Sequence, residues 1–383
     1  MGIAELTRNA VDVLPEGGLE AKLELGRTLR VKFGIDVTSP DIHIGRGVPL
    51  QRMRAFQEEG HKGVLIVGDY TTRIGDPSGR SAERPILSDE EIDANAQLYL
   101  DQAKVLLRDE PELLEVRYNG EWLSKLTYAD VVRLGRITTV ARMLERDDFE
   151  QRYRAGEPIS ISELLYPLMQ AYDSVAIEAD VELGGTDQLY NLLAGREVME
   201  AFGLEPQVVL TTPLLLSWDG EKMSSSVGNN VPLTAAPEEM FGRTMRIPDS
   251  QLAEWWALVA ERPVPEGDPM EAKLELARFI VCRSHGEDAA REAEEHFTRV
   301  VRRGEAPEEV AEYPLPAGES VHLPALLADA FGLSTSEARR LISQGGVKLD
   351  GDAVSELDLP RERLAGAVLQ AGKRRFVRLN GAA

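Results

Sequence analysis

The sequence predicts a multidomain α/β protein whose first and largest part is a parallel sheet covered by helices. The chain has 383 residues, which is long for a single hydrophobic core. Residues 1–235 alternate short apolar runs with amphipathic stretches, as in strand–helix–strand units. Beyond this point the pattern becomes helical, and it ends in a short α/β tail. We therefore expect three domains, at residues 1–235, 236–315 and 320–383.

Four apolar runs in the first part of the chain are expected to form buried strands. Short apolar runs bounded by turn residues are typical of parallel strands that are covered on both faces. An amphipathic stretch at 47–60 predicts the helix between the first two of them. The four runs are residues 29–36, 62–69, 181–185 and 207–216.

The strand–helix alternation is interrupted by a mostly amphipathic helical stretch, and we expect an insertion at about 118–160. After residue 236 the periodicity is helical, with no clear strand as far as about residue 310. A stretch rich in Pro and Glu at 304–320 predicts a linker. Turn signals such as "QGG" (344–346) then mark a compact α/β tail.

Charge and cysteine content limit the possible partners and the compartment. The net charge of −22 argues against general affinity for polyanions. From Ser334 to Ala383, however, nine Lys/Arg against six Asp/Glu give a net charge of +3, which fits either an anionic partner or a few solvated arginines. One cysteine, Cys282, excludes an internal disulfide, and no signal peptide or apolar span is evident. We expect a soluble cytoplasmic protein without a membrane partner.

The segment "SPDIHIGRG" (39–47) lies where a strand gives way to a helix. A glycine-rich turn that opens a helix offers free backbone N–H groups and a positive helix end to phosphate. His43 can donate to a phosphate oxygen, and Arg46 adds positive charge. Taken alone, the segment favours a plainer interpretation, a turn glycine beside a capping histidine.

The segment "GEKMSSS" (220–226) places Lys222 and three hydroxyls on a loop that follows a glycine. Such a loop suits a mobile clamp on a polyphosphate, because an ammonium neutralises the charge that develops on departing pyrophosphate. Taken alone, the segment favours a plainer interpretation, a polar surface loop. The presence of both segments in this order favours the phosphate interpretation.

Together the two segments resemble the HIGH and KMSKS signatures of class I aminoacyl-tRNA synthetases. "VGDYTTRIGDPSGRS" (67–81), "LLYPLMQAYDSV" (164–175) and "VELGGTDQLYN" (181–191) resemble the tyrosyl-tRNA synthetases in order and spacing. "STSEARRLISQGGVKLDG" (334–351) resembles the S4 RNA-binding module that ends the bacterial members. The resemblance covers nearly the whole chain. It implies a Rossmann-like catalytic domain with a helical insertion, a helical anticodon-binding domain and a small α+β S4-like domain.

The resemblance also implies a reaction and its partners. L-Tyrosine would be activated with ATP, accompanied by Mg²⁺, to tyrosyl-adenylate and pyrophosphate, and the tyrosyl group would pass to the 3′ end of tRNA(Tyr). Members of the family are homodimers joined through the insertion. The apolar residues Val131, Val132, Leu134 and Met143 are candidates for that interface, and they fit an internal core equally well. No metal ion held by protein ligands is implied.

Family positions carry over to this chain residue by residue. The implied catalytic residues are His43, Lys222 and Arg46. The implied ATP-binding residues are Gly34, Asp36, His43, Gly45, Gly185, Asp187, Lys222, Ser224 and Ser225. The implied tyrosine-binding residues are Lys32, Thr71, Asp76, Tyr166, Gln170, Asp173 and Gln188. The implied tRNA-binding residues are Arg339, Arg340, Lys348, Lys373, Arg374 and Arg375.

The tyrosine pocket also has a physical rationale. Tyr166, Gln170 and Asp173 are spaced i, i+4, i+7 and share one face of a predicted helix. By the family pattern Asp173 accepts the phenolic hydrogen. A buried acceptor of this kind discriminates against phenylalanine by roughly 10⁴–10⁵, because it would otherwise lack a partner. Without its flanking motifs the stretch fits a plain amphipathic helix with a surface aspartate.

Three residues depart from the family pattern. Arg46 replaces the second histidine of HIGH, and Ser225 replaces the second lysine of KMSKS, a charge that a bound K⁺ is able to supply. Lys32 replaces a tyrosine that contacts the substrate phenol in many members. These departures leave two alternatives to a tyrosine–tRNA ligase: an RNA-binding or regulatory relative without activity, and an enzyme for a modified tyrosine.

Overall fold

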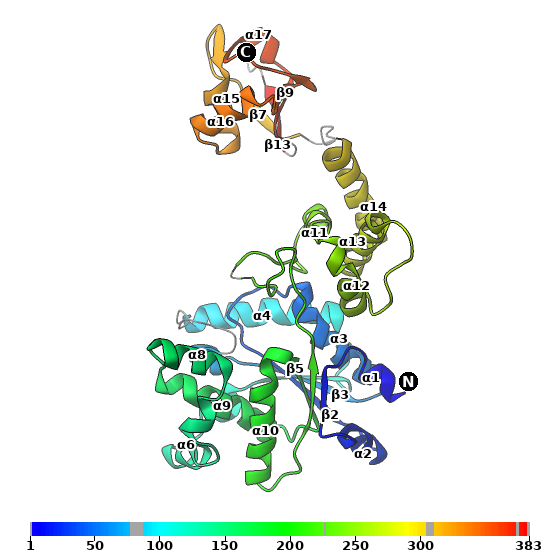
Figure 1. Ribbon diagram of the computed structural model, residues 1–383, viewed down its shortest axis with the longest axis vertical. Helices are drawn as coiled ribbons and strands as arrows, with labels where there is room; N and C mark the ends of the chain where they lie inside the picture. The colour runs from blue at the N-terminus through cyan, green and yellow to red at the C-terminus, as the bar shows by residue number, and fades with distance from the viewer. Residues whose placement is uncertain (1, 77–86, 226, 304–309, 373–374, 381–383) are drawn as a thin grey trace. The chain divides into compact units, whose positions relative to one another are not determined.

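The computed structural model describes residues 2–76, 87–225, 227–303, 310–372 and 375–380. The chain divides into two compact units (Figure 1). The first unit comprises Met1–Ala236 with Arg243–Ser284, and the second comprises Pro237–Gly242 with His285–Ala383. The three domain boundaries expected from the sequence stay a prediction.

A six-stranded sheet forms the centre of the first unit, in the order β1-β6-β5-β2-β3-β4. All neighbouring strands are parallel except β1, which pairs antiparallel with β6. This arrangement confirms the predicted α/β class. The strands are β1 (Asp12–Leu14), β2 (Arg30–Ile35), β3 (Lys62–Val67), β4 (Leu114–Tyr118), β5 (Val181–Gly185) and β6 (Val208–Thr212).

The order of the strands brings the predicted functional segments to one edge of the sheet. β2 and β5 are neighbours and run parallel, so their carboxyl ends lie side by side. Asp36 follows β2 directly, and the turn Thr186–Gln188 follows β5. Ligands of open α/β sheets bind at this edge.

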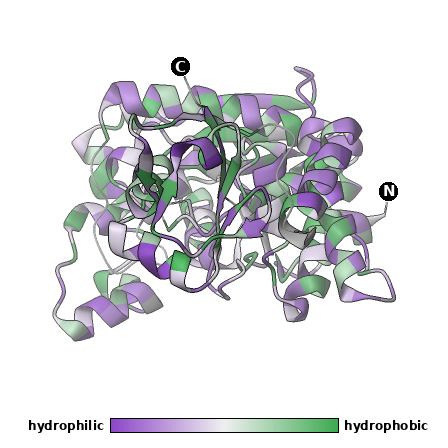
Figure 2. Cartoon of the chain, turned by 90° about the horizontal axis from the view of Figure 1, so that it is seen from above, coloured by the Kyte–Doolittle hydropathy of each residue, from purple (hydrophilic) through white to green (hydrophobic). Residues whose placement is uncertain are grey.

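Helices cover the sheet and supply the site with side chains. The principal ones are α3 (Ile44–Glu58), α9 (Ile161–Ala176) and α10 (Leu189–Ala201), and α9 packs against α10 (Figure 1). Hydrophilic and hydrophobic residues alternate along the helical ribbons of the chain, as expected for helices with one face toward a core (Figure 2). Other helices of this unit are α1 (Ile3–Leu6), α2 (Gly18–Glu24), η1 (Thr71–Arg73), α4 (Asp89–Leu106), η2 (Thr186–Gln188), η3 (Asp249–Gln251), α12 (Leu252–Trp255), η4 (Trp256–Ala260) and α13 (Pro269–His285).

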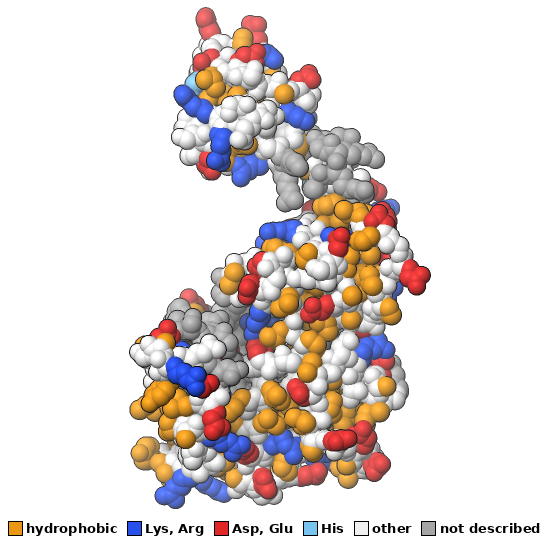
Figure 3. Space-filling model, in the orientation of Figure 1, with side chains coloured by type: hydrophobic (Ala, Val, Ile, Leu, Met, Phe, Trp, Pro, Cys, Tyr) orange, Lys and Arg blue, Asp and Glu red, His pale blue; other side chains and the backbone are white. Residues whose placement is uncertain are grey.

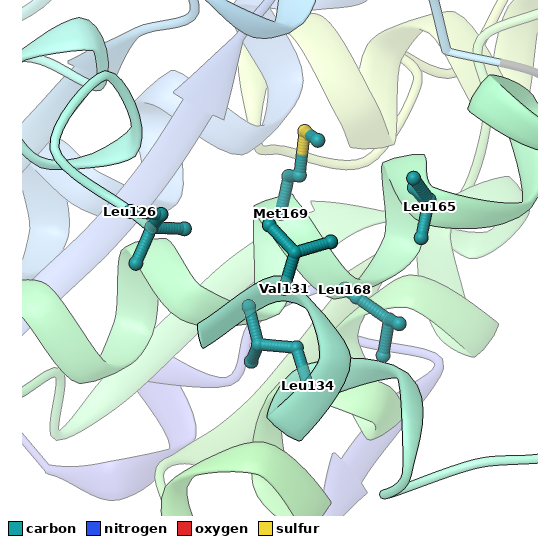
Figure 4. Close-up of a pocket in the computed structure, with 6 residues that line it drawn as sticks. All are labelled: Leu126, Val131, Leu134, Leu165, Leu168 and Met169. Atoms are coloured by element: carbon teal, nitrogen blue, oxygen red, sulfur yellow. The ribbon is translucent and has the colours of Figure 1, made fainter. Parts of the chain in front are cut away.

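The predicted insertion consists of short helices that pack on α9. Leu134 and Met143 are buried in a core cluster with Leu168, so these two interface candidates belong to the interior. Val132, in contrast, is 40% exposed. The helices are α5 (Gly120–Leu123), α6 (Tyr128–Gly135), α7 (Val140–Met143) and α8 (Asp147–Ala155). A small apolar cavity lies in this region, lined by Leu126, Val131, Leu134, Leu165, Leu168 and Met169 (Figure 4).

The second unit ends in a small α+β module with its own core. A five-stranded sheet has the order β10-β9-β12-β13-β7, and β8 pairs with β11. The module comprises β7 (Glu312–Pro314), β8 (Ser320–His322), α15 (Leu323–Phe331), α16 (Thr335–Ser343), β9 (Val347–Leu349), β10 (Asp352–Ala353), β11 (Asp358–Pro360), α17 (Arg361–Leu364), β12 (Val368–Ala371) and β13 (Arg375–Asn380). Preceding helices of this unit are α11 (Pro237–Thr244, shared with the first unit), α14 (Glu287–His296) and η5 (Phe297–Arg303).

One local prediction for this part of the chain is wrong in part. The sequence predicted a linker at 304–320. Residues 304–309 lie outside the described residues, but Glu312–Pro314 forms β7, which pairs parallel with β13 at the edge of the sheet. An edge position tolerates the proline that made the stretch resemble a linker. Within the described residues, no helix is both long and apolar enough to cross a membrane.

Candidate active site

His43 is the N-cap of α3. Its Nδ1 accepts a hydrogen bond from the backbone N–H of Arg46 at 3.3 Å. A neutral imidazole whose Nδ1 accepts carries its hydrogen on Nε2, so the second ring nitrogen is a donor. Burial, with the positive charges of Arg46 and Lys222, lowers the pKa of His43 well below its usual value. The ring is therefore neutral at physiological pH, and its Nε2–H is available to an acceptor.

The turn that holds His43 is paired through its backbone with the chain that follows the second signature segment. Ile44 N–H donates to the Val231 carbonyl at 3.0 Å, and Leu233 N–H donates to the Ile42 carbonyl at 2.8 Å. These bonds form an antiparallel bridge between His43 and Pro232. The chain just after the KMSSS loop is thus paired with the turn that holds the histidine.

The Lys222 side chain reaches Asp187, another of the implied ATP-binding residues. Its ammonium forms an ion pair with the Asp187 carboxylate in the turn after β5. The loop itself is held by Asn229, whose Oδ1 accepts from Ser224 N–H at 2.9 Å and whose amide donates to Asp219. Sequence reasoning missed Asn229, although it follows the loop closely. Asn230 donates to Ser225 Oγ at 3.0 Å.

Asp36, at the end of β2, connects the nucleotide and tyrosine sides of the site. Its two oxygens accept from Tyr166 Oη at 3.0 Å and from Thr71 Oγ1 at 2.7 Å. A Cβ on Gly68 would lie 2.4 Å from both Asp36 Oδ1 and Thr71 Oγ1, so this contact requires glycine at position 68. Gly34 lies within β2, two residues before Asp36.

Asp173 lies buried on α9 with two donors on its carboxylate. Trp122 Nε1 donates to Oδ1 at 2.8 Å, and Asn119 Nδ2 donates to Oδ2 at 3.3 Å. Asn119 also donates to Thr71, which joins Asp173 to the Asp36 bonds. Burial raises the pKa of Asp173 to about 7, against the lowering effect of Lys32 and the two donors. Sequence reasoning missed Asn119 and Trp122, because nothing in their spacing indicates a shared partner.

A second set of polar contacts joins Asp76 and Gln188, two of the implied tyrosine-binding residues. Gln188 Nε2 donates to Asp76 Oδ2 at 2.9 Å, and Asn191 Nδ2 donates to Gln188 Oε1 at 3.1 Å. Arg146 NH1 in turn donates to Asn191 Oδ1 at 2.9 Å. These bonds fix which atoms of Gln188 face Asp76, and they leave Asp76 Oδ2 with a neutral donor.

The Lys32 ammonium points into the protein. It pairs with Glu182 Oε1 at 2.7 Å and donates to Ser174 Oγ at 2.8 Å and to the Gln170 carbonyl at 2.9 Å. An ammonium has three hydrogens, and three acceptors surround this one. A direct donation from Lys32 to a substrate phenol is therefore not supported by this geometry.

Comparisons with known proteins show the family to which the chain belongs. Residues 24–302 match the family model "tRNA synthetases class I (W and Y)". The chain is 48% identical to the tyrosine–tRNA ligase of Moorella thermoacetica, over 98% of this chain and 94% of that protein. This chain belongs to the tyrosyl-tRNA synthetases. It is also 45% identical to the Thermotoga maritima tyrosine–tRNA ligase, over 98% of this chain and 96% of the relative.

Solved structures show the same fold. A mitochondrial tyrosyl-tRNA synthetase from Aspergillus nidulans, truncated at its C-terminus, matches with a TM-score of 0.63 at 23% identity, over 76% of this chain and 91% of the other. The tyrosyl-tRNA synthetase from Archaeoglobus fulgidus, complexed with L-tyrosine, matches with a TM-score of 0.60 at 23% identity, over 76% of this chain and 98% of the other. These matches confirm the Rossmann-like α/β fold.

The predicted tRNA-binding residues divide between two faces of the C-terminal module. Arg339 and Arg340 are exposed on α16. The hydrogen bonds from Ser334 are the main cause of the lowered pKa of Glu337, and the charges of Arg340 and Arg375 lower it further. These two arginines therefore lie near one carboxylate. Lys348 pairs with Gln370 in the sheet and faces away from the buried side chains of β9. Lys373 and Arg374 lie outside the described residues.

Proposed function

We propose that the residues around His43, Lys222 and Asp173 carry out the tyrosine–tRNA ligase reaction, EC 6.1.1.1, of the family to which the chain belongs. Tyrosine would attack the α-phosphate of ATP to give tyrosyl-adenylate and pyrophosphate, and the tyrosyl group would then pass to tRNA(Tyr). The observation that supports this best is the backbone pairing of residues 42–44 with 231–233. It places a neutral histidine donor beside the loop of Lys222.

The protein's contribution to activation is positioning and charge stabilisation, since no protein nucleophile is needed. In this proposal His43 Nε2–H donates to a phosphate oxygen of ATP. Lys222 exchanges its carboxylate partner Asp187 for the pyrophosphate that leaves. Asp187 is thereby released to accept from a ribose hydroxyl. Arg46 adds fixed positive charge at the first turn of α3, where the positive end of the helix also favours an anion.

Mg²⁺ would enter with ATP. No cluster of three or more His, Cys, Asp or Glu side chains suited to a metal ion is present in the part of the chain that the structure describes. When bound, the ion would neutralise phosphate charge beside Lys222.

Potassium binding is a separate proposal. A bound K⁺ would supply the positive charge that is missing because Ser225 replaces a lysine. The structure offers a second source. Arg243 NH1 donates to the carbonyl and the Oδ1 of Asn230 at 2.6 and 3.1 Å, and Asn230 donates to Ser225. Potassium-free exchange assays separate the two: a slower rate supports the ion, and an unchanged rate supports Arg243.

For tyrosine, we propose that Asp173 accepts the phenolic hydrogen while polar groups hold the ammonium. Asp173 is only 3% exposed, so an analogue without the hydroxyl would leave a buried carboxylate short of a partner. The proposed contacts to the rest of the amino acid are Thr71, Asp76, Tyr166, Gln170 and Gln188. An enzyme specialised for a modified tyrosine is not favoured, because Lys32, which motivated it, is turned inward.

Tyrosine-dependent exchange between pyrophosphate and ATP tests the proposed function. The unaltered chain should catalyse exchange with tyrosine, and His43→Ala should reduce the rate by about 10²–10³. Addition of tRNA should then give charged tRNA. A chain that binds tRNA but shows no exchange would instead be the regulatory relative.

Assembly and location are further proposals. Large apolar side chains are exposed on the insertion and on α9: Tyr128 is 85%, Tyr153 is 66% and Ile161 is 77% exposed. Apolar side chains are visible among charged ones on this part of the surface (Figure 3). We propose that this surface joins two subunits, that the basic residues of α16 and β13 bind tRNA, and that the enzyme works in the cytoplasm.

A further inference from the structure

A buried ion pair lies beneath the proposed tyrosine pocket. Lys32 on β2 and Glu182 on β5 are direct neighbours in the parallel register, and they are 0% and 1% exposed. The pair is fully hydrogen-bonded. Glu182 Oε1 forms the ion pair with the Lys32 ammonium, and Glu182 Oε2 accepts hydrogen bonds from Ser174 Oγ at 3.0 Å and from Gln207 Nε2 at 2.8 Å. Such a pair is costly to bury and therefore invites a functional explanation.

Two of the three contacts of Lys32 fall on one turn of α9. It donates to the carbonyl of Gln170 and to the hydroxyl of Ser174. Gln170 and Asp173 are both among the proposed contacts to tyrosine, and Ser174 adjoins Asp173. One ammonium thus connects the sheet to the single helical turn that presents both substrate contacts.

We propose that Lys32 is a positioning residue for tyrosine recognition, which holds this turn of α9 against the sheet and keeps Asp173 an ionised acceptor for the phenol. The inference rests on the proposed function and deepens it. Lys32 does not touch the substrate, and it acts through Asp173 and Gln170. The role differs from a purely structural ion pair in that it predicts a change in the pH dependence of binding.

The charges that face Asp173 make the direction of that change explicit. Lys32 from β2 lowers the pKa of Asp173, Glu182 from β5 raises it, and the neutral donors Trp122 and Asn119 lower it. The effect of Lys32 exceeds that of Glu182. Removal of Lys32 should therefore make the carboxylate harder to ionise, and removal of the charge on Glu182 should make it easier.

The experiment measures tyrosine binding by calorimetry between pH 5.5 and 9, with no ATP. In the unaltered chain, affinity should fall below about pH 7 as Asp173 takes up its proton. Lys32→Met should move this acid limb to higher pH by about one unit. Glu182→Gln should move it to lower pH. Lys32→Met should also raise the KM for tyrosine in the exchange assay about fivefold at pH 7, because the ionised fraction of Asp173 falls by that factor, with the KM for ATP unchanged.

Two control variants test whether the effect is specific to Lys32 and whether an unpaired buried charge unfolds the chain. Lys22 on α2 is another buried lysine, 4% exposed and paired with Asp180 and Glu205, and Lys22→Met should leave the acid limb where it was. If the lone Glu182 charge unfolds the single variant, Lys32→Met/Glu182→Gln removes both charges and should still move the limb upward. Limbs that stay in place, or that move together in both single variants, would overturn the role of Lys32.

Failure of this inference and failure of the proposed function look different. A chain that exchanges pyrophosphate with tyrosine but shows unmoved acid limbs loses only the positioning role. A chain that neither binds tyrosine nor catalyses exchange loses the proposed function, and the role of Lys32 falls with it.

Discussion

His43 is expected to have two separable roles, as a helix cap and as a phosphate donor. In His43→Ala, the Arg46 N–H loses its side-chain partner at the start of α3, which should cost about 1 kcal/mol of unfolding free energy. The same change removes the Nε2–H donor, which should cost about 3 kcal/mol in the transition state, or 10²–10³ in kcat. His43→Ser separates the roles. A serine caps the helix as well as any residue, but its short side chain cannot reach where Nε2 lies.

Denaturant unfolding and pyrophosphate exchange measure the two roles independently. His43→Ser should recover most of the stability lost in the alanine variant and none of the rate. The KM for tyrosine should stay within about twofold in both variants, since the histidine lies on the nucleotide side. A serine variant with the full rate would refute the donor role, and one as unstable as alanine would refute the cap.

Three other predictions follow from the structure. Burial raises the pKa of Asp173 to about 7, above its ordinary value of 3.8. The contribution of Asp173 to the unfolding free energy should therefore decline as the pH rises between these two values, whereas tyrosine affinity should rise through pH 7. Denaturant titrations and calorimetry at matched pH check the two directions. Arg340→Ala and Arg375→Ala should each weaken tRNA binding and reduce the slope of log affinity against log salt by about one, and a slope unchanged in both would contradict the proposed contact. Ile161→Asp should shift the chain from dimer to monomer in analytical ultracentrifugation. A variant that stays dimeric would show that this exposed surface is not the interface.

The parts of the fold that follow from sequence are those with a strong periodic signal. β2, β3, β5 and β6 were expected because their apolar runs are buried on both faces, as Val64–Val67 illustrates. β4 was missed because it is an edge strand whose residues are all half-buried, so its side chains need not be apolar. β7 was missed because three residues ending in Pro314 carry no strand pattern of their own.

The site divides in a similar way. Motif order identified His43, Lys222 and Asp173, whose chemistry depends on residue type and local spacing. The donors Asn119 and Trp122 were not found, because their contact with Asp173 arises only when α5 folds against α9. The inward direction of Lys32 was equally hidden, since its partner Glu182 is brought to it by strand pairing rather than by sequence.

A crystal structure with a non-hydrolysable tyrosyl-adenylate analogue tests the central claim most directly. We expect the phenolic oxygen to lie within hydrogen-bonding distance of Asp173 and the ribose to lie beside Asp187. The Lys222 ammonium should no longer be paired with the Asp187 carboxylate. An analogue bound elsewhere, or a phenol held with Asp173 out of reach, would contradict it.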